Sequence, residues 1–568
     1  MIVGIDLGTT HSLIGLWSAD GARLIPNVLG ELLTPSVVGV TDDGEVLVGR
    51  AAQEQLALKP DRTVAAFKRY MGSARETRLG RRSFRPEELS ALVLKSLLAD
   101  VKAHTGELPH EAVVSVPAYF SDAQRKATRN AAQIAGVRVE RLINEPTAAA
   151  LAYGLQEQQD ESKFLVLDLG GGTFDVSLLE SFEGVMEVHA SAGDNFLGGE
   201  DFVEVLVDAA LRDLRRDPKS LSAATRAGIR ARLERVKCQL SQHAEVSVNL
   251  QFDDAVVPWQ ISEARFENLA QTLLARMRAP IERALRDSNT RAQDLDQIVL
   301  VGGASRMPMI SRLVTRLFGR LPLRHVQPDQ TVALGACVMA GMKSRDQAFR
   351  EVVMTDVCPY TLGIEISHTD QNQHVHHGLF SPIIERNTVI PASRVERYNP
   401  MADFQKALVL QVYQGESPEV AHNIFLGKME LPLPPRRSAE NPVDVRFTYD
   451  VNGLLEVQAK VLATGAEHQL VIEQNPGLLS PQEIERRLRE LAEIKIHPRE
   501  LQGNIALLAR AARVYEEHTA AARHEIGVRL LEFKAALETQ LPPRIEAARE
   551  YLGTLLDQLE GDSSPLQP

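Results

Sequence analysis

The sequence predicts a multidomain protein with an α/β domain first, an all-β unit second and a helical segment last. Three observations lead to this prediction. Strand-like and helix-like segments alternate over residues 1–345, short strands with turn signals fill residues 356–475, and helical patterns begin at Ser480. At 568 residues the chain is too long for one hydrophobic core, so several folding units are expected.

Bulk composition restricts the function classes. Hydrophobic residues make up 44% and charged residues 24% of the chain, which is typical of a folded globular protein. The formal net charge of −12 repels phosphate backbones, so no nucleic-acid partner is expected. Cys238, Cys337 and Cys358 match no metal-ligand spacing and are expected to be reduced, buried thiols. No signal peptide and no apolar run of about 20 residues is recognisable, so we expect a cytoplasmic protein without membrane insertion.

The α/β prediction depends on the order of elements in the first part of the chain. Residues 113–116 are rich in β-branched valine, and a helical pattern over residues 122–136 follows them. Residues 164–167 and 298–301 are continuous apolar runs, the pattern of strands covered on both faces. After Pro86, apolar residues recur at helical spacing, which predicts a helix that begins there.

The all-β prediction depends on four short alternating segments and the turns between them. Asn452-Gly453 and Thr464-Gly465 are turn signals of the kind found in hairpins. The predicted strands cover residues 407–413, 443–449, 454–462 and 469–473.

The helical segment begins with a capping box formed by Ser480 and Glu483, after which apolar residues recur at helical spacing. His497-Pro498 and Pro542-Pro543 are expected to break it into shorter helices, because proline removes a backbone hydrogen bond and clashes with the preceding turn. Residues 561–568 are predicted to be a frayed tail.

A sequence motif that occurs twice in the chain provides most of the functional information. In residues 3–10 an apolar strand ends at Asp6 and continues as Leu-Gly-Thr-Thr, and residues 166–175 repeat this as Asp168 followed by Leu-Gly-Gly-Gly-Thr. Another strand follows each segment, so both are predicted hairpins. Glycines at a hairpin tip allow backbone N–H groups to close on a ligand. The two tips predict a polyphosphate site, and the strand-end acids suit a Mg²⁺ ion that keeps most of its waters.

A third glycine-rich segment, residues 302–308, follows a predicted strand and precedes a predicted helix. One such segment is usually a plain turn, whereas three in this order indicate nucleotide binding. The Gly-x-x-x-x-Gly-Lys-Ser/Thr motif and the dinucleotide fingerprint are missing. Residues 193–199 come nearest to the former, but Glu200 stands where the lysine should be.

These segments resemble the two phosphate loops and the adenosine loop of DnaK-like chaperones, the seventy-kilodalton heat-shock family within the actin-like ATPase superfamily. The likeness continues to about residue 495, and several shortened stretches are most similar to the HscC branch. The resembling motifs are residues 5–10, 115–120, 143–150, 167–176, 197–202 and 301–308.

The resemblance implies an architecture in five parts. An actin-like, ribonuclease-H-like duplicated ATPase domain is followed by a linker, a β-sandwich peptide-binding domain, a short helical lid and a tail. The expected bounds of these parts are residues 1–348, 349–356, 357–478, 479–560 and 561–568.

The resemblance also assigns roles to residues of the ATPase site, with ATP and Mg²⁺ as its ligands. Lys68 is placed beside the γ-phosphate and the attacking water, Glu145 and Asp175 as water and metal positioners, and Thr173 as a γ-phosphate contact. By itself Lys68 would be taken for a surface lysine. The remaining nucleotide contacts are Gly8, Thr9, Thr10, Gly171, Gly172, Gly199, Glu234, Lys237, Ser241, Gly302, Gly303 and Arg306, with Asp6 and Asp168 holding the metal through water.

Cys238 and Ala304 stand where many relatives have polar adenosine contacts, so unusually tight ATP binding is not expected. Pro117 and Arg125 resemble the switch pair that reports nucleotide state, although Pro117 could be a plain strand terminator. Val352, Val353 and Met354 resemble the apolar interdomain linker. Residues that resemble the lining of the peptide groove, although apolar strand residues are usually core, are Ile364, Tyr398, Met401, Leu408 and Leu410.

The implied function is ATP-dependent chaperoning of unfolded or extended polypeptides, by a monomer that works with a J-domain co-chaperone; need for an exchange factor stays open. Three rivals remain. They are a sugar or glycerol kinase, which would lack the β unit; an actin-like filament; and an inactive relative, although the residues needed for catalysis are present.

Residues 367–377 contain four histidines, and a solvated loop is the preferred interpretation over a metal site.

Overall fold

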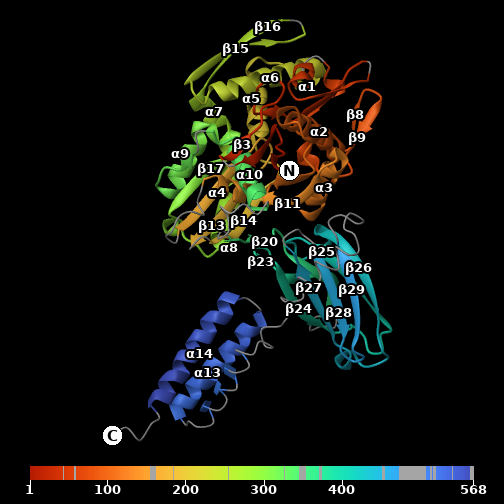
Figure 1. Cartoon of the computed structure of the whole chain (residues 1–568), viewed down its shortest axis with the longest axis vertical. Helices are drawn as coiled ribbons and strands as arrows, with labels where there is room; N and C mark the ends of the chain where they lie inside the picture. The colour runs from red at the N-terminus through yellow and green to blue at the C-terminus, as the bar shows by residue number, and fades with distance from the viewer. Residues whose placement is uncertain are drawn as a thin grey trace. The chain divides into compact units, whose positions relative to one another are not determined.

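The computed structural model describes residues 1–562 except 19, 43, 57–58, 154–161, 183–184, 254, 325–326, 344–352, 370–373, 451–454, 473–503, 505–506, 509, 512–513, 516–519 and 540–541. The chain divides into two units (Figure 1). Unit 1 comprises Met1–Tyr360 and Glu385–Ile390, and unit 2 comprises Thr361–Ile384 and Pro391–Pro568. The short segment Glu385–Ile390 therefore belongs to unit 1, although unit 2 contains the residues on both sides of it.

The first sheet of unit 1 is built around β1, which pairs in parallel with β10 and antiparallel with β2. The strand order is β11-β10-β1-β2-β3, and β4 also pairs with β2. Its strands are β1 (Ile2–Asp6), β2 (His11–Ser18), β3 (Gly21–Leu24), β4 (Thr34–Pro35), β10 (Glu111–Val116) and β11 (Arg138–Asn144).

The second sheet repeats this plan around β12, which pairs in parallel with β17 and antiparallel with β13. The order β18-β17-β12-β13-β14 matches β11-β10-β1-β2-β3 strand for strand, and β19 is added at the edge. The duplicated fold that the resemblance implied is therefore present. The strands are β12 (Ser162–Leu169), β13 (Phe174–Phe182), β14 (Val185–Asp194), β17 (Gln297–Val301), β18 (Leu323–Arg324) and β19 (Val353–Met354).

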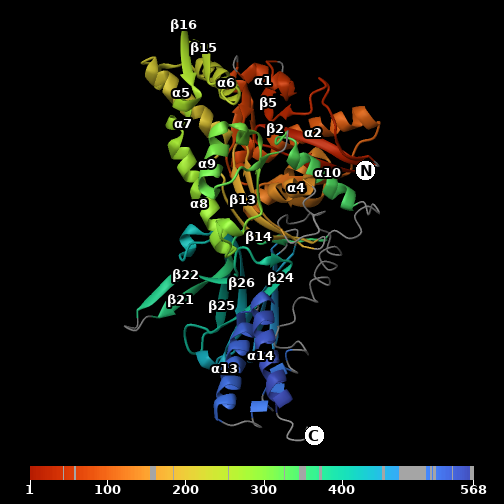
Figure 2. The same cartoon turned by 90° about the vertical axis from the view of Figure 1, so that its left-hand side faces the viewer.

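Helices α4 (Glu145–Ala152) and α10 (Thr331–Lys343) pack between the two sheets. One apolar cluster combines Val113 of the first sheet and Val166 of the second with Ala148 and Ala336 from these helices. On the second sheet, α8 (Gln271–Asp287) packs on β13 and β14 (Figure 2). Packing of both sheets on shared helices fixes the position of one hairpin tip relative to the other.

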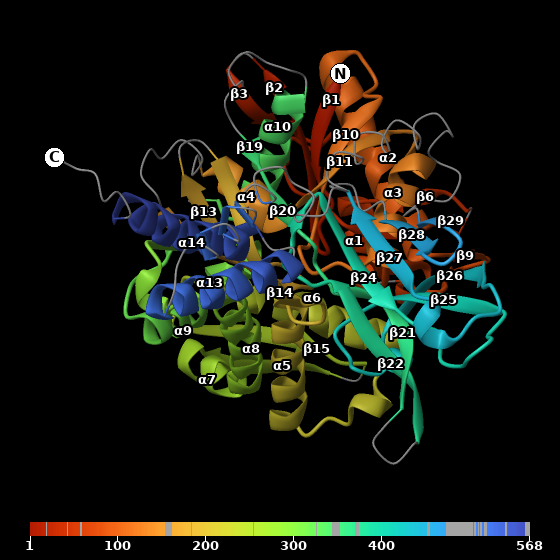
Figure 3. The same cartoon turned by 90° about the horizontal axis from the view of Figure 1, so that it is seen from below.

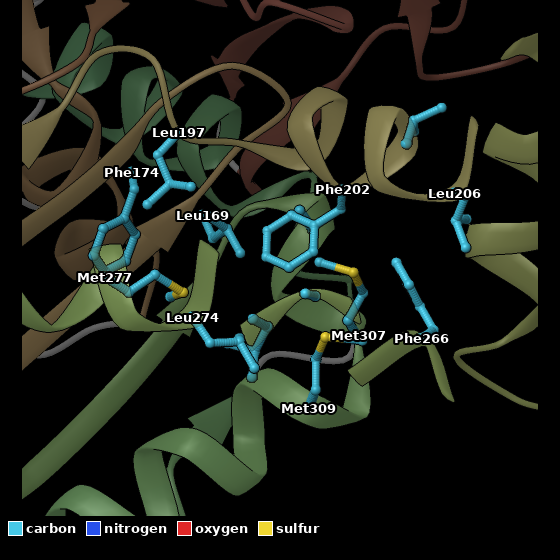
Figure 4. Packing of buried hydrophobic residues seen from close by; sticks show 14 of the residues in the cluster. Leu169, Phe174, Leu197, Phe202, Leu206, Phe266, Leu274, Met277, Met307 and Met309 are labelled. Carbon is cyan, nitrogen blue, oxygen red and sulfur yellow. The ribbon is translucent and has the colours of Figure 1, made fainter. Parts of the chain in front are cut away.

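A separate core lies behind the second predicted phosphate hairpin (Figure 4). Phe174, Leu197, Phe202, Phe266 and Met277 are all fully buried there, and the Phe202 and Phe266 rings meet edge to face with centroids 6.4 Å apart. This dense packing holds the start of β13 and the helix that contains Phe202 in fixed positions.

The remaining elements of unit 1 surround these sheets. Local sequence explains several of them: Pro86 is the first residue of α2, Glu88 accepts from the Arg85 N–H at 2.7 Å, and Gly106 ends the helix with a positive φ of 82°. The helices are α1 (Arg50–Leu56), α2 (Pro86–Thr105), α3 (Asp122–Ala135), α5 (Gly199–Asp213), α6 (Ala223–Gln239), α7 (Glu263–Leu269) and α9 (Pro308–Phe318). The small strands are β5 (Val37–Val40), β6 (Val46–Val48), β7 (Thr63–Ala65), β8 (Thr77–Leu79), β9 (Arg82–Phe84), β15 (Glu245–Gln251), β16 (Val256–Ser262), β20 (Asp356–Val357) and β23 (Val389–Ile390).

Unit 2 contains two four-stranded antiparallel sheets with the orders β22-β21-β25-β26 and β24-β27-β28-β29. Alternate residues are buried from Val443 to Phe447 of β27, which is the pattern of a strand with one face in a core. This matches the expected β-sandwich. The strands are β21 (Leu362–Thr369), β22 (Val375–Ile384), β24 (Ala392–Tyr398), β25 (Ala407–Gln414), β26 (Ile424–Pro432), β27 (Val443–Tyr449), β28 (Leu455–Val461) and β29 (Ala466–Ile472).

At the C-terminal end, α13 (Ala520–Thr539) and α14 (Pro542–Asp562) lie side by side (Figure 3). The predicted break at Pro542-Pro543 is confirmed, because α13 ends at Thr539 and a new helix begins at Pro542. Phe533 and Leu552 are fully buried in a core that also contains Val514. The capping box at Ser480 and the break at His497-Pro498 lie outside the described residues.

Two expectations are wrong. Ser367–Thr369 and Val375–His377, expected in a loop, continue strands β21 and β22, with His368 opposite His376 in the register. Hairpin pairing satisfies their backbone groups, which a loop would leave to solvent. Cys337 and Cys358 are buried as expected, but Cys238 is exposed because the buried face of α6 contains its neighbours Leu233 and Val236 instead.

Candidate functional site

The two repeated segments, residues 3–10 and 166–175, form hairpin tips, as predicted, and these tips meet inside unit 1. Asp6 pairs with Leu13 in the first hairpin, and Asp168 pairs with Asp175 in the second. The tips approach so closely that a Cβ atom on Gly171 would lie 1.9 Å from Thr10 Oγ1. Only glycine fits at this point, which leaves the backbone N–H groups of the tip accessible to an anion.

The helix α5 begins at the second tip. The Gly199 N–H donates to the Gly170 carbonyl at 2.9 Å, and the Glu200 N–H donates to the Gly171 carbonyl at 2.9 Å. The positive end of the helix dipole is therefore fixed beside the glycine loop, an arrangement that favours a phosphate group.

The third glycine-rich segment contacts the second hairpin. Gly302 has a φ of 83°, and a Cβ atom there would lie 2.5 Å from Asp168 Oδ1 and 2.4 Å from the Leu169 carbonyl oxygen. Gly303–Arg306 then forms a 3-10 turn in front of α9. The guanidinium of Arg306 pairs with Asp329 at 2.7 Å and stays partly exposed.

Lys68 is not a surface lysine, because its side chain is only 4% exposed. It lies in the 3-10 turn Phe67–Tyr70, which follows Ala66 in the left-handed region with φ 54°. The ammonium donates to Glu145 Oε1 at 2.8 Å, and Glu145 is the first residue of α4. Lys68 Nζ also lies 5.5 Å from the centroid of the Phe120 ring.

Four buried carboxyl groups interact electrostatically with Lys68 and with one another. Burial, reinforced by the charge of Glu145, raises the pKa of Asp6 to about 6 and the pKa of Asp175 to about 7. Burial and the charges of Glu145, Asp175 and Asp6 raise the pKa of Asp168 well above its ordinary value. Four carboxyl groups surround a single lysine, so the ionised site carries an excess of negative charge. A bound cation would neutralise that excess.

These residues fit a hydrated Mg²⁺ ion and a polyphosphate. Asp175 Oδ2 is buried and has no hydrogen-bond partner among the described residues, while Oδ1 accepts the Tyr119 N–H at 3.0 Å. In the part of the chain that the structure describes, no three His, Cys, Asp or Glu residues form a preformed metal site. Mg²⁺ does not require one, since it usually keeps several waters and binds one or two carboxylates.

Helix α6 provides the residues expected at the adenosine. Lys237 is buried, and its ammonium donates to Glu234 Oε2 at 2.8 Å and to the Gly199 carbonyl at 3.1 Å. Gly199 also lies close to Ala304, because a Cβ atom on it would be 3.2 Å from the Ala304 Cβ. Ser241 follows α6, and its N–H donates to the Cys238 carbonyl at 3.2 Å. The structure thus connects α6 to the phosphate loop and to the third glycine-rich segment.

Arg125 of the predicted switch pair is hydrogen-bonded to the residue that precedes Glu145. Pro117 follows β10, and Arg125 of α3 donates to the carbonyls of Ala118 and Phe120 at 3.1 and 3.2 Å. Arg125 also donates to Asn144 Oδ1 at 2.7 Å. The loop after Pro117 and the residue before Glu145 are therefore held by one buried guanidinium.

Asn144 extends this network to the end of the predicted linker. Its amide donates to Asp356 Oδ1 and Oδ2 at 2.8 and 2.7 Å. Val353 and Met354 form β19, which pairs in parallel with Val185 and Met186 of β14, and Val352 lies outside the described residues. The described part of the predicted linker thus extends the second sheet of unit 1.

The five residues predicted to line a peptide groove share one cavity of unit 2. The cavity has a volume of about 360 Å³. Ile364 and Leu410 are buried, whereas Met401 is 47% exposed. The lining residues named in the sequence analysis are Ile364, Tyr398, Met401, Leu408 and Leu410.

Arg69 was overlooked by sequence reasoning. Its Nε donates to the Gly172 carbonyl at 3.1 Å, and its guanidinium pairs with Asp201 of α5, whose Oδ2 also accepts the Gly198 N–H at 2.8 Å. Arg69 therefore braces the second phosphate loop from the other half of the duplicated domain. Its only signal in the sequence is its place beside Lys68.

A duplicated α/β fold with two facing phosphate hairpins defines a nucleotide-hydrolysing ATPase of the actin-like class. A family model described as "Hsp70 protein" matches residues 2–541, and the chain belongs to this family. It is 42% identical over 530 residues to "Chaperone protein DnaK" of Thermotoga petrophila, covering 90% of this chain and 86% of that protein. It is 40% identical to "Chaperone protein DnaK" of Thermosipho africanus, covering 83% and 79%.

Membership of the family settles the general activity. The protein is an ATPase that binds ATP with Mg²⁺ and works in a chaperone cycle that assists protein folding. The kinase and filament alternatives are therefore set aside. Similarity to the HscC branch stays a prediction. Among the described residues, no helix is long and apolar enough to cross a membrane.

Proposed function

We propose that Lys68, Glu145, Thr173 and Asp175 carry out ATP hydrolysis. The observation that carries this proposal is the buried ion pair of Lys68 and Glu145, placed among three further carboxyl groups. An ammonium in this position neutralises charge that develops on the γ-phosphate, which is the main requirement of phosphoryl transfer. Glu145 and Asp175 orient the attacking water, and Thr173, buried next to Asp175, contacts the γ-phosphate.

Asp6 and Asp168 are proposed to hold Mg²⁺ through water, and the ion supplies neutralisation of phosphate charge. The unpartnered Asp175 Oδ2 and the raised pKa of Asp168 support this assignment, since both indicate uncompensated acceptors. The backbone around Gly8, Thr9, Thr10, Gly171 and Gly172 holds the phosphates. Gly199, Glu234, Lys237, Ser241, Gly302, Gly303 and Arg306 hold the adenosine side.

The cavity of unit 2 is proposed to bind unfolded or extended apolar segments of client proteins. Its lining combines the aliphatic side chains of Ile364, Leu408 and Leu410 with the ring of Tyr398. A volume of about 360 Å³ accepts a few apolar side chains but not a folded domain. Binding there buries apolar surface that an unfolded client exposes to water.

The domain bounds are proposed as residues 1–348, 349–356, 357–478, 479–560 and 561–568. Pro117 and Arg125 are proposed as the switch that couples nucleotide state to the linker Val352, Val353 and Met354. The contact of Arg125 with Asn144, and of Asn144 with Asp356, supports this coupling.

The partners are proposed to be client polypeptides and a J-domain co-chaperone, with the chain acting as a cytoplasmic monomer and without nucleic acid. The net charge of −12 and the three free cysteines support these assignments.

Single-turnover hydrolysis of ATP, with and without an unfolded peptide, tests the proposal. We expect slow basal hydrolysis that the peptide accelerates. A chain that releases no phosphate would overturn the assigned catalytic group. Hydrolysis that never responds to peptide would overturn the assigned coupling between the groove and the site.

A further inference from the structure

Tyr360 contacts the ATPase site although it is the last residue of the long N-terminal segment of unit 1. Its hydroxyl donates to the backbone carbonyl of Tyr119 at 2.9 Å. The two tyrosine rings also pack together, with centroids 4.6 Å apart and an interplanar angle of 38°. Tyr360 therefore makes both a polar and an aromatic contact with one residue 241 positions earlier.

Tyr119 in turn fixes Asp175. Its backbone N–H donates to Asp175 Oδ1 at 3.0 Å, and this leaves Oδ2 as the oxygen without a partner among the described residues. A Cβ atom on Gly193 would lie 2.8 Å from the Tyr119 Cβ and 3.1 Å from Asp175 Oδ1, so the three residues are tightly packed. A shift of the Tyr119 backbone would therefore rotate or release the carboxyl group.

Two other side chains hold Tyr119. Asn195 donates from Nδ2 to the same backbone carbonyl at 3.0 Å, and Arg283 donates to the Tyr119 hydroxyl at 3.1 Å. Tyr360 and Asn195 thus share one acceptor, and their side chains also interact with each other. Their effects on Tyr119 are expected to depend on each other, as for any two donors that fix the same group.

We infer that Tyr360 is a positioning residue for ATP hydrolysis, which acts on Asp175 through the backbone of Tyr119. The inference rests on the proposed role of Asp175 in orienting the attacking water. Among the described residues, the hydrogen bond and the ring contact of Tyr360 are both made with Tyr119, which is not assigned to the phosphates, the metal or the adenosine. The influence of Tyr360 is therefore expected on the hydrolysis step and not on nucleotide binding.

The test is single-turnover ATP hydrolysis by the full chain, measured together with the Kd for ATP. Tyr360→Phe keeps the ring and loses one hydrogen bond, so we expect the rate to fall on the order of fivefold. Tyr360→Ala also loses the ring contact, and a fall on the order of tenfold or more is expected. The Kd is expected to stay within about twofold, since only the transition state depends on Asp175.

Tyr153→Phe is the matched control, because Tyr153 of unit 1 also donates its hydroxyl to a backbone carbonyl, that of Leu300 at 3.4 Å. It is expected to leave the rate unchanged. A double-mutant cycle of Tyr360→Phe with Asn195→Ala supplies a readout that simple destabilisation does not move. The two rate effects are expected to be non-additive.

The outcomes are distinct. If the parent chain does not hydrolyse ATP, the proposed catalytic group fails. If the parent is active and Tyr360→Phe hydrolyses ATP at the same rate, the inference about Tyr360 is wrong. Additive effects in the cycle would likewise contradict action through the shared carbonyl. Thermal unfolding followed by tryptophan fluorescence checks that each variant is folded, since Trp17 and Trp259, the two tryptophans of the chain, lie in unit 1.

Discussion

Lys68 and Glu145 form a buried ion pair, with Nζ and Oε1 2.8 Å apart, although 77 positions separate them in the chain. The pair joins the 3-10 turn after Ala66 to the first residue of α4. Neither residue has another recorded side-chain hydrogen bond among the described residues. A buried pair of this kind is costly to assemble, and its position beside the phosphate hairpins gives it a chemical use.

Lys68→Ala is expected to preserve ATP binding and to stop hydrolysis. The ammonium charge matters more in the transition state than in the ground state, so the rate should fall by about 100-fold or more while the Kd changes little. Single-turnover hydrolysis and ATP affinity are measured together. Lys59→Ala is the control, since Lys59 forms an exposed pair with Asp42. Near-normal hydrolysis by the Lys68 variant would remove Lys68 from the catalytic group.

Replacing Val352 and Val353 with Asp is expected to keep basal hydrolysis and to abolish its stimulation by peptide. Val353 belongs to β19, which pairs at the edge of the second sheet, and a charged segment should dock there less readily because desolvating a carboxylate is costly. Peptide binding in unit 2 and ATP hydrolysis in unit 1 would then no longer be coupled. Val256→Asp, at a 56% exposed site of the β15–β16 hairpin, is the matched control. Peptide stimulation equal to that of the parent would show that this segment is not the coupler.

Asp6→Asn is expected to stabilise the metal-free protein at neutral pH. The folded state raises the pKa of Asp6 from 3.8 to about 6, so the folded state binds its proton more tightly than the unfolded chain. The corresponding stability is present below pH ~4 and is lost as the pH rises through about 6, because burial disfavours the charged carboxylate.

The amide is neutral at every pH, so the variant should exceed the parent by roughly 2–3 kcal/mol at pH 7.5 and match it near pH 4. Urea unfolding in the presence of a chelator, followed by tryptophan fluorescence, measures the difference. Asp61→Asn, at an exposed position, controls for the loss of one surface charge. A difference that does not grow with pH contradicts the assignment.

Leu408→Asp is expected to weaken binding of an apolar peptide by about tenfold or more, because a carboxylate in the cavity of unit 2 would be desolvated by the peptide. Fluorescence anisotropy of a labelled extended peptide gives the Kd. Ile424→Asp, on the same sheet at a 44% exposed site outside the cavity lining, is the control. Equal losses in both variants would place the peptide elsewhere.

Peptide is expected to be held only briefly, even with ADP bound. The described C-terminal helices α13 and α14 are separated at Pro542 and bury apolar residues such as Phe533 and Leu552 in a core of their own. Apolar surface used in this way is not available to close a groove, so closure should be weak and release fast. Stopped-flow release from the full chain is compared with a shortened chain that ends at Pro476. Strong slowing of release by residues 477–568 would show that these residues form an effective lid.

The sequence by itself determined the features that depend on neighbouring residues. Both phosphate hairpins are encoded within about ten residues each, by an acid at the strand end and glycines at the tip, and the structure forms both where expected. The helix after Pro86 and the break before Pro542 follow from the same local rules, since proline fixes φ and lacks an N–H. The assignment of Lys68 and of the groove residues came instead from the resemblance to a family, because no local sequence pattern distinguishes them.

Only the tertiary structure decided which of these parts meet. The contact of Gly171 with Thr10, the pairing of Lys68 with Glu145 and the bonds from Asn144 to Asp356 join residues up to 212 positions apart. Such contacts depend on how two sheets pack on α4 and α10, a sum over many weak apolar contacts that no short segment specifies. The same holds for Tyr360, whose ring has a partner only because the fold brings Tyr119 within 4.6 Å of it.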